Sequence, residues 1–262
     1  MQTAKNEFDE VNILSEIDNI SAARPAAVVR RDLLKAASGA GLVLSTPACT
    51  TLPRLASDLQ TVWRFDQLDQ IRASVTVEGS PTPTNAPVAG ALQFDGVEDA
   101  LFIADHPLAG ARTFAFEAIF RPDGRRFEQR WLHLQSDEVT VEGQPSIGTR
   151  FLFEIRVYGN EWALDTFIKG PSYSQALLFP DKLHPLGRWH HVAQTYDGTT
   201  YRSFVDGALQ GEAPVAFTPQ GPGRASVGTR INRRDYFEGA IAEARFTKAF
   251  LAPDQFNRKI TG

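Results

Sequence analysis

The residues whose types and spacing could support chemistry lie in one predicted β-hairpin. Residues 151–168 alternate in polarity on both sides of Gly159-Asn160, a pair typical of a short turn. If these two residues form the loop, Glu154 faces Asp165 across the strands. Opposed carboxyl groups repel each other unless they are protonated, bridged or bound to a metal. One could then be an acid of raised pKa and the other a nucleophile, because retaining glycosidases place two carboxyl groups roughly 5–5.5 Å apart.

A simpler interpretation of this face is electrostatic. Arg150 and Arg156 lie on the same side of the hairpin as Glu154 and would neutralise an ordinary solvated surface. The sequence favours this interpretation. Such a polar face with an aromatic residue, Tyr158, also suits binding of a ligand without chemistry.

A neighbouring predicted strand adds an aromatic candidate. Trp131 and His133 share one side of residues 130–135, opposite two leucines. An exposed tryptophan beside polar groups suits stacking on a sugar ring, whereas a core position for this tryptophan is the alternative. The candidate ligand-binding residues are therefore Trp131, His133, Glu154, Arg156, Tyr158 and Asp165.

The elements that would position these residues are short strands. From about residue 59 to residue 250, runs of alternating polarity are separated by turn signals such as Asp95-Gly96 and Asp206-Gly207, and sustained helical periodicity is absent. The Pro-rich stretch 80–87 predicts a surface loop. The predicted strands are 59–65, 73–77, 91–95, 101–104, 113–121, 130–135, 149–158, 161–168, 188–196, 200–205, 224–228 and 237–246. A dozen strands at this spacing predict one all-β domain, a two-sheet sandwich or a barrel.

The apolar sides of these strands predict the core. Phe114, Phe116, Ala118 and Phe120 share one side of their strand by alternation. In the hairpin, the predicted core residues are Phe151, Phe153, Ile155, Val157, Trp162, Leu164 and Ile168.

Composition excludes several classes of protein. The 262 residues are 42% hydrophobic, which allows a sizeable core, and the formal charge of −4 argues against nucleic-acid binding. Cys49 is the only cysteine, so an intramolecular disulfide and a cysteine-based metal cluster are impossible.

The N-terminal quarter differs from the rest. Residues 1–29 form an acidic leader, predicted to be disordered or a short helix, and residues 30–49 resemble a twin-arginine export signal. Arg30, Arg31, Leu33, Leu34 and Lys35 match that signal, although Val29 replaces the usual Ser or Thr. The apolar run that follows is too short to cross a membrane, which takes roughly 20 residues. A buried or amphipathic helix with a chance arginine pair is the alternative.

This resemblance implies the twin-arginine export machinery as a partner and a periplasmic or secreted location, with no transmembrane segment once the signal is removed. Cleavage could follow Ala48, and residues 50–58 would be a linker to a domain at 59–262. A lipoprotein site at Cys49 is the weaker interpretation, because Thr46 and Pro47 fit a lipobox poorly.

Five segments, in order, resemble laminin-G-like domains of the concanavalin A-like lectin/glucanase superfamily. They are Leu92-Gln93-Phe94-Asp95-Gly96 with Asp99, residues 113–122 (TFAFEAIFRP), residues 187–193 (GRWHHVA), Tyr196-Asp197-Gly198 with Phe204-Val205-Asp206-Gly207, and Val227-Gly228 with residues 237–246 (FEGAIAEARF). The resemblance implies a two-sheet antiparallel jelly-roll sandwich. It implies no single activity, because the superfamily includes lectins, adhesion modules, glycosidases and lyases.

The resemblance also bears on metal and catalysis. Many members hold Ca²⁺ through oxygens of the opening and closing motifs, and Asp95 and Asp99 are available here, but Ala242 replaces the closing aspartate. The Glu-x-Asp-x-x-Glu run of the bacterial glucanases is missing.

The sequence therefore predicts an exported, non-catalytic protein that binds a polysaccharide or glycan. One alternative is a glycoside hydrolase or polysaccharide lyase that uses Glu154 and Asp165, with His133 or Arg156 assisting. The other is a protein-interaction or adhesion module. The identity of the ligand, catalysis, calcium occupancy, the true start and cleavage positions, and the oligomeric state stay open.

Overall fold

The computed structural model describes residues 59–88, 90–137 and 148–258. The predictions for the leader, the export signal and the linker concern residues 1–58 and lie outside the described residues. Within them, strands dominate and the helices are single 3-10 turns, η2 (Leu68–Gln70) and η3 (Pro253–Gln255). No helix in the described part of the chain is long and apolar enough to span a membrane.

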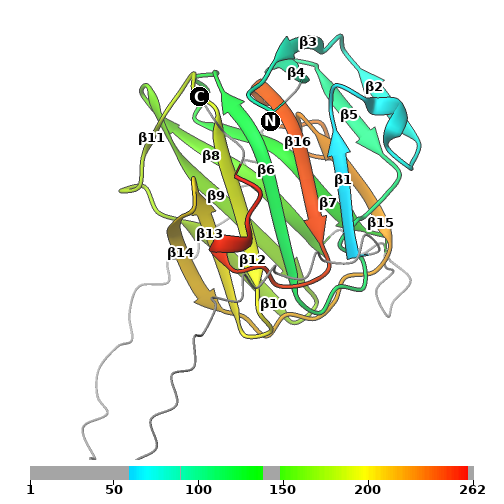
Figure 1. The fold of residues 1–262 in the computed structure, drawn as a ribbon, viewed down its shortest axis with the longest axis vertical. Coiled ribbons are helices and arrows are strands. Elements are labelled where there is room, and N and C mark those ends of the chain that lie inside the picture. The colour runs from blue at the N-terminus through cyan, green and yellow to red at the C-terminus, as the bar shows by residue number, and fades with distance from the viewer. Residues whose placement is uncertain (1–58, 89, 138–147, 259–262) are drawn as a thin grey trace, which may run out of the picture. The chain divides into compact units, whose positions relative to one another are not determined.

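The strands form two antiparallel sheets (Figure 1). The strands of the first sheet are β1 (Gln60–Arg64), β3 (Thr82–Asn85), β4 (Gly90–Asp95), β6 (Phe114–Pro122), β12 (His190–Tyr196), β13 (Thr200–Val205), β14 (Ala208–Pro214) and β16 (Glu238–Thr247). Their order is β14-β13-β12-β6-β16-β4-β3, and β1 pairs with β16.

The second sheet positions the candidate site. Its strands are β2 (Val75–Glu78), β5 (Ala100–Ile103), β7 (Glu128–Ser136), β8 (Arg150–Tyr158), β9 (Glu161–Gly170), β10 (Tyr173–Leu178), β11 (His184–Pro185) and β15 (Gly223–Val227). The order is β10-β9-β8-β7-β15-β5-β2, and β11 pairs with β9. Neighbouring strands that are distant in sequence, such as β7 and β15, confirm the predicted two-sheet sandwich rather than a simple meander.

Alternation fills the space between the sheets with aromatic side chains. Phe116 of the first sheet contacts Phe153 of the second, with ring centroids 4.1 Å apart. Phe120 stacks on Trp131 at 4.9 Å and meets Trp162 edge-on at 5.2 Å. All predicted core residues of β6 and of the β8–β9 hairpin are buried in this one cluster, as predicted. Each large aromatic buried in this way contributes roughly 2–3 kcal/mol to stability.

The predicted register of the β8–β9 hairpin is confirmed. Glu154 pairs with Asp165 and Tyr158 with Glu161, around the turn at Gly159. Gly159 has a φ of +68°, a conformation that costs glycine little, and so permits the tight turn that sets this register.

A β-bulge in β7 overturns the expectation that Trp131 shares a face with His133. Opposite β8, Arg130 pairs with Glu154, but Leu132 pairs with Phe153, so Trp131 is an extra residue. Because of this insertion Trp131 and Leu132 both enter the core, and Trp131 is fully buried. Its core position, the alternative interpretation, is confirmed, and Trp131 cannot stack on a ligand.

All twelve predicted strands are present, and their ends lie within two residues of the predicted ones, but several others were not predicted. The stretch 80–87 was expected to be a loop, yet residues 82–85 form β3. Pro83 is compatible with this because β3 is the last strand of its sheet, where a missing N–H need not disrupt pairing. Tyr173, which lies outside the predicted strands, begins β10.

The outer faces of the two sheets differ. On the first sheet, Leu251 and Phe256 of the C-terminal segment pack against Ala115, Ala193 and Phe204, and Figure 1 shows η3 crossing this face. The outer face of the second sheet instead carries a concentration of charged side chains, described next.

Candidate ligand-binding site

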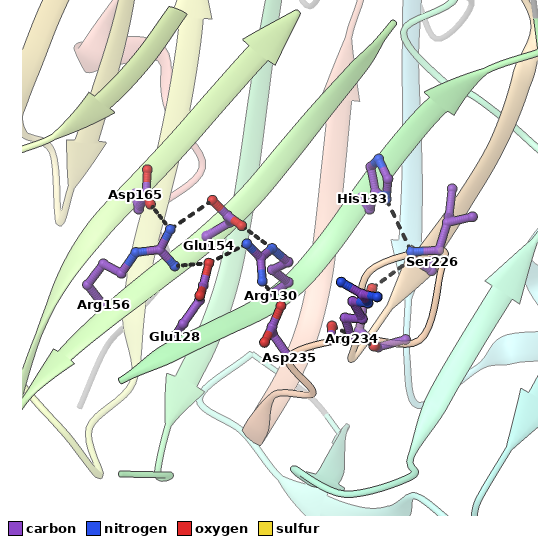
Figure 2. A network of polar contacts seen from close by, with 11 residues as sticks. Glu128, Arg130, His133, Glu154, Arg156, Asp165, Ser226, Arg234 and Asp235 are labelled. Carbon is purple, nitrogen blue, oxygen red and sulfur yellow. Dashed lines mark hydrogen bonds and ion pairs between the residues drawn. The ribbon is translucent and has the colours of Figure 1, made fainter. Parts of the chain in front are cut away.

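Charged side chains from three adjacent strands of the second sheet form one ionic network (Figure 2). Arg130 comes from β7, Glu154 and Arg156 come from β8, and Asp165 comes from β9. The bulge at Trp131 places Arg130 beside Glu154. The extra residue shifts the alternation by one position, so that Arg130 before the bulge and His133 after it both lie on the outer face.

Arg130 joins two strands to a distant loop. Its guanidinium forms ion pairs with Glu154 of β8, with Glu128 of its own strand, and with Asp235 of the segment before β16. These contacts are visible at the centre of Figure 2. Arg130 therefore connects the sheet to residues about one hundred positions later in the chain.

Arg156 makes the second set of contacts. Its Nη2 lies 2.8 Å from Oδ2 of Asp165 and 3.4 Å from Oε2 of Glu154, and its Nη1 lies 3.1 Å from Oε1 of Glu128. Two arginines thus hold four carboxylates. Such a network fixes the side chains in place before any ligand arrives.

The two predicted catalytic carboxyl groups are brought together but shielded. The side chains of Glu154 and Asp165 are only 5% and 6% exposed. Burial, and then the charge of Asp165, raise the pKa of Glu154 to about 7. Burial also raises the pKa of Asp165, although the charge of Arg156 and a hydrogen bond with Glu154 act in the opposite direction. Carboxyl groups in hydrogen-bonding contact are much closer than the roughly 5–5.5 Å of retaining glycosidases.

His133 lies on the same outer face, and it is also buried. Its exposed fraction is 2%, and its Nδ1 accepts a hydrogen bond from the backbone N–H of Ile231 at 3.1 Å. Burial, followed by the charges of Arg230 and Arg150, lowers its pKa to about 3. The imidazole is therefore neutral at physiological pH.

The accessible part of this surface is an aromatic pair, Tyr158 and Phe127, of which the sequence analysis predicted only Tyr158. Tyr158 at the end of β8 meets Phe127 edge-on, with ring centroids 5.6 Å apart. Phe127 is 57% exposed, and the guanidinium carbon of Arg156 lies 6.0 Å from its ring centroid. Phe127 precedes β7 and belongs to no predicted strand, so alternation could not place it. Its position among charged residues was the only signal in the sequence.

A shallow hollow of about 270 Å³ lies at the same end of the sandwich. It is lined by Asp123, Arg125, Asn160, Leu186 and Gly187. Nη1 of Arg125 donates to Oδ1 of Asn160 at 2.6 Å, which ties the loop before Phe127 to the hairpin turn after Tyr158.

The predicted calcium ligands form a turn. Oδ1 of Asp95 accepts the backbone N–H groups of Val97, Glu98 and Asp99 at 2.8–3.1 Å. The carboxylate of Asp99 accepts the backbone N–H of Ser80 at 2.6 Å and that of Asp95 at 3.0 Å. Asp95 thus stabilises the turn that follows β4.

The pairing of β4 with β16 shows how far Ala242, which replaces the closing aspartate of the family, lies from Asp95. Asp95 pairs with Glu238 of β16, whereas Leu92 pairs with Ile241, so residue 242 lies about four residues, or roughly 13 Å, along the strand from Asp95. Ca²⁺ takes six to eight oxygens. The described residues contain no group of three or more carboxylate, histidine or cysteine side chains that could hold a metal. The donor set does not fit a complete calcium site, and calcium binding stays a prediction.

Two packed antiparallel sheets define a jelly-roll sandwich. Residues 95–256 match the family described as the Concanavalin A-like lectin/glucanases superfamily. Because this match covers more than half of the chain, the protein belongs to that superfamily, as the sequence motifs predicted. A search of the curated proteins found no match.

Solved structures agree on the fold. Domain 4 of AbnA, a GH43 extracellular arabinanase from Geobacillus stearothermophilus, solved with arabinotriose, is 15% identical, with a TM-score of 0.52 over 77% of this chain and 88% of that chain. The binding domain of Paraclostridial Mosquitocidal Protein 1 is 9% identical, with a TM-score of 0.51 over 71% of this chain and 47% of that one. A botulinum neurotoxin type C structure, described as dependent on two ganglioside molecules for cell entry, is 9% identical, with a TM-score of 0.51 over 75% and 49%. The chain spans about half the length of these last two.

Proposed function

We propose that this protein binds a carbohydrate without transforming it, on the outer face of the second sheet. The observation that carries the proposal is the exposed ring of Phe127, packed edge-on against the half-buried Tyr158 beside a fixed ionic network. A sugar ring stacks on Phe127, and its hydroxyl groups bond to Arg156 and Glu128 at the accessible edge of that network. The similar AbnA domain, solved with arabinotriose, supports the idea that this fold can hold an oligosaccharide.

The burial and the ion pairs of Glu154 and Asp165 support the proposal that the protein does not transform its ligand. A general acid must reach the oxygen that it protonates. Glu154 and Asp165 are almost fully covered and bound by Arg130 and Arg156. They act in this proposal as the groups that orient the two arginines.

The test is a binding titration of the full chain against a polysaccharide panel that includes arabinan. Phe127→Ala should weaken binding of the best glycan about tenfold, since one stacking contact is worth roughly 1–2 kcal/mol. Val97→Ala is the matched control, because Val97 is 62% exposed in the turn after β4, away from the network. Equal binding by both variants, or no binding to any glycan, would refute the proposal.

A glycoside hydrolase or polysaccharide lyase is the second candidate, and one observation favours it. The pKa of Glu154, raised to about 7, suits a general acid at neutral pH. Product release by the wild type that disappears in Glu154→Gln, with folding intact, would establish this candidate over pure binding. The protein-interaction alternative stays a prediction.

We also propose that the protein is exported by the twin-arginine machinery to the periplasm or the medium. The support is the sequence of residues 30–49, with Arg30 and Arg31 before an apolar run. Replacing both arginines by lysine should leave the full-length protein in the cytoplasm, whereas the wild type should be exported and begin after Ala48. Mass spectrometry of exported protein that still carries Met1 would contradict a cleaved signal.

A further inference from the structure

We propose that the hollow beside Asn160 is a second sugar subsite, so that the ligand of this protein is an oligosaccharide chain of two or more residues rather than a single sugar. This inference rests on the proposed carbohydrate-binding function, in which Phe127 holds the first residue, and it specifies the length of the ligand. It follows from where the hollow lies, from the hydrogen bonds that shape it and from the chemistry of its walls.

The hollow continues from the aromatic pair. The backbone N–H of Val157 donates to the carbonyl of Phe127 at 2.8 Å, so the chain before Phe127 runs beside the end of β8. Arg125 lies two residues before Phe127, at most about 7 Å along the chain, and Asn160 lies two residues after Tyr158. Arg125 and Asn160 both line the hollow and bond to each other. A ligand that extends from Phe127 in this direction therefore reaches the hollow.

The walls of the hollow are held together before any ligand binds. They come from the segment after β6, from the turn between β8 and β9, and from the segment between β11 and β12. The backbone N–H of Leu186 donates to the carbonyl of Asn160 at 3.0 Å, and that of Gly187 donates to the carbonyl of Pro122 at 2.8 Å. Because these bonds join all three segments, little conformational entropy is lost when a ligand enters.

The side chains in the walls suit a sugar. The carboxylate of Asp123 accepts a hydrogen bond from Nε of Arg121 at 2.9 Å, which fixes it as an acceptor. The bond from Arg125 to Asn160 uses one of several N–H groups of its guanidinium, so the others can donate to a ligand. Leu186 adds an apolar contact. A sugar ring carries hydroxyl groups that donate and accept, together with C–H groups, and so matches all three kinds of contact.

The hollow is open to solvent and has room for one sugar ring. Arg125, Asn160 and Gly187 are exposed, in contrast to the covered carboxyl groups of the ionic network. The volume of about 270 Å³ is slightly below the roughly 300–1,000 Å³ of pockets for drug-sized ligands. One ring therefore enters, and the rest of the chain lies outside, over Phe127.

The test compares ligands that differ only in length. Oligosaccharides of one, two, three and four residues are prepared from the polysaccharide that the full chain binds best, and each is titrated into the full chain. The affinity should rise about tenfold between one and three residues, because the second ring adds its own hydrogen bonds. Saturation-transfer NMR measures the weak binding of the single sugar.

Arg125→Ala should lower the affinity for the three-residue ligand about tenfold. It should leave the affinity for the single sugar within twofold, because the single sugar is held by stacking on Phe127. Arg126→Ala is the matched control, since Arg126 is the next residue, carries the same charge and is exposed, but does not line the hollow. Its affinities should stay within twofold at every length. Equal losses in the two variants, or a loss at every length in Arg125→Ala, would contradict a subsite in the hollow.

The outcomes separate the two proposals. Equal affinity for every length overturns the second subsite and leaves carbohydrate binding intact, whereas failure of every glycan to bind overturns both. Saturation transfer to the three-residue ligand gives a second readout. The wild type should saturate the protons of two adjacent rings, and Arg125→Ala those of one ring; a single saturated ring in the wild type would contradict the inference.

Discussion

Burial and the charge of Asp165 disfavour the ionised form of Glu154 more than Arg130 and Arg156 favour it. Covered by the sheet and opposed by Asp165, it has a pKa of about 7, against 4.5 for an ordinary glutamate. Between these two values the folded protein binds more protons at this site than the unfolded chain does. Stability contributed by the site therefore falls as pH rises from about 4.5 to 7, and levels off above.

A comparison of the wild type with Glu154→Gln isolates this effect. Glutamine cannot ionise, and the histidines of lowered pKa, such as His133 and His106, are common to both proteins. The free energy of unfolding of the variant relative to the wild type should therefore rise by about 2 kcal/mol between pH 5 and pH 8. Urea unfolding across this range is the measurement, and a difference independent of pH would show that Glu154 has an ordinary pKa.

Asp99 provides a residue-scale prediction about metal. Its carboxylate accepts two backbone N–H groups, and the donor set around it does not fit a complete calcium site, so Asp99→Ala should lower the free energy of unfolding by about 2–4 kcal/mol. The loss should be the same in calcium and in chelator. A wild-type melting temperature that rises with calcium would instead support the calcium prediction for Asp95 and Asp99.

At the scale of elements, β7 determines which side chains lie on the outer face of the second sheet. Its bulge divides the strand, so that Trp131 and Leu132 both fill the core while Arg130 and His133 both remain outside.

Before the bulge, the buried side chain of Gln129 ties three segments together. It accepts the N–H of Glu238 at 3.0 Å and donates to the carbonyl groups of Gly124 and Arg126 at 3.0 and 3.1 Å.

Gln129→Leu should therefore destabilise the fold and displace the segment that carries Phe127. Loss of these three hydrogen bonds should lower the free energy of unfolding by about 2–4 kcal/mol. Gln135→Leu is the matched control, since Gln135 lies on the same strand and its side chain makes no hydrogen bond to other described residues. Urea unfolding and glycan titration measure both effects; comparable losses in the two variants would contradict the role of Gln129.

Across the described part of the molecule, the outer faces of the two sheets are covered differently. The C-terminal segment covers the first sheet with Leu251 and Phe256, and the backbone N–H of Asn257 donates to Glu117 at 2.6 Å. On the second sheet, no described segment covers Phe127, whose ring is 57% exposed. This asymmetry is why the second sheet is the proposed binding face.

Phe256→Ala tests the separation of the two faces. Loss of this buried ring from its small cluster should lower the free energy of unfolding by about 2–4 kcal/mol. Affinity for the glycan should stay within twofold, measured well below the melting temperature. A loss of affinity as large as that of Phe127→Ala would mean that the first sheet also takes part in binding.

The sequence by itself determined the parts of this protein that depend on local alternation and turns. A period of two places Phe153 and Trp162 in the core, and the glycine turn at 159 sets Glu154 opposite Asp165, so both could be predicted without coordinates. Tertiary structure alone decided the side on which Trp131 lies, because a bulge shifts alternation by one residue without a sequence signal. It also decided that Asp235 forms an ion pair with Arg130 and that the backbone N–H of Ile231 meets His133, since no strand pattern includes the segment that carries Asp235 and Ile231. Such contacts between distant segments arise only when the sheets pack and connecting loops close over their faces.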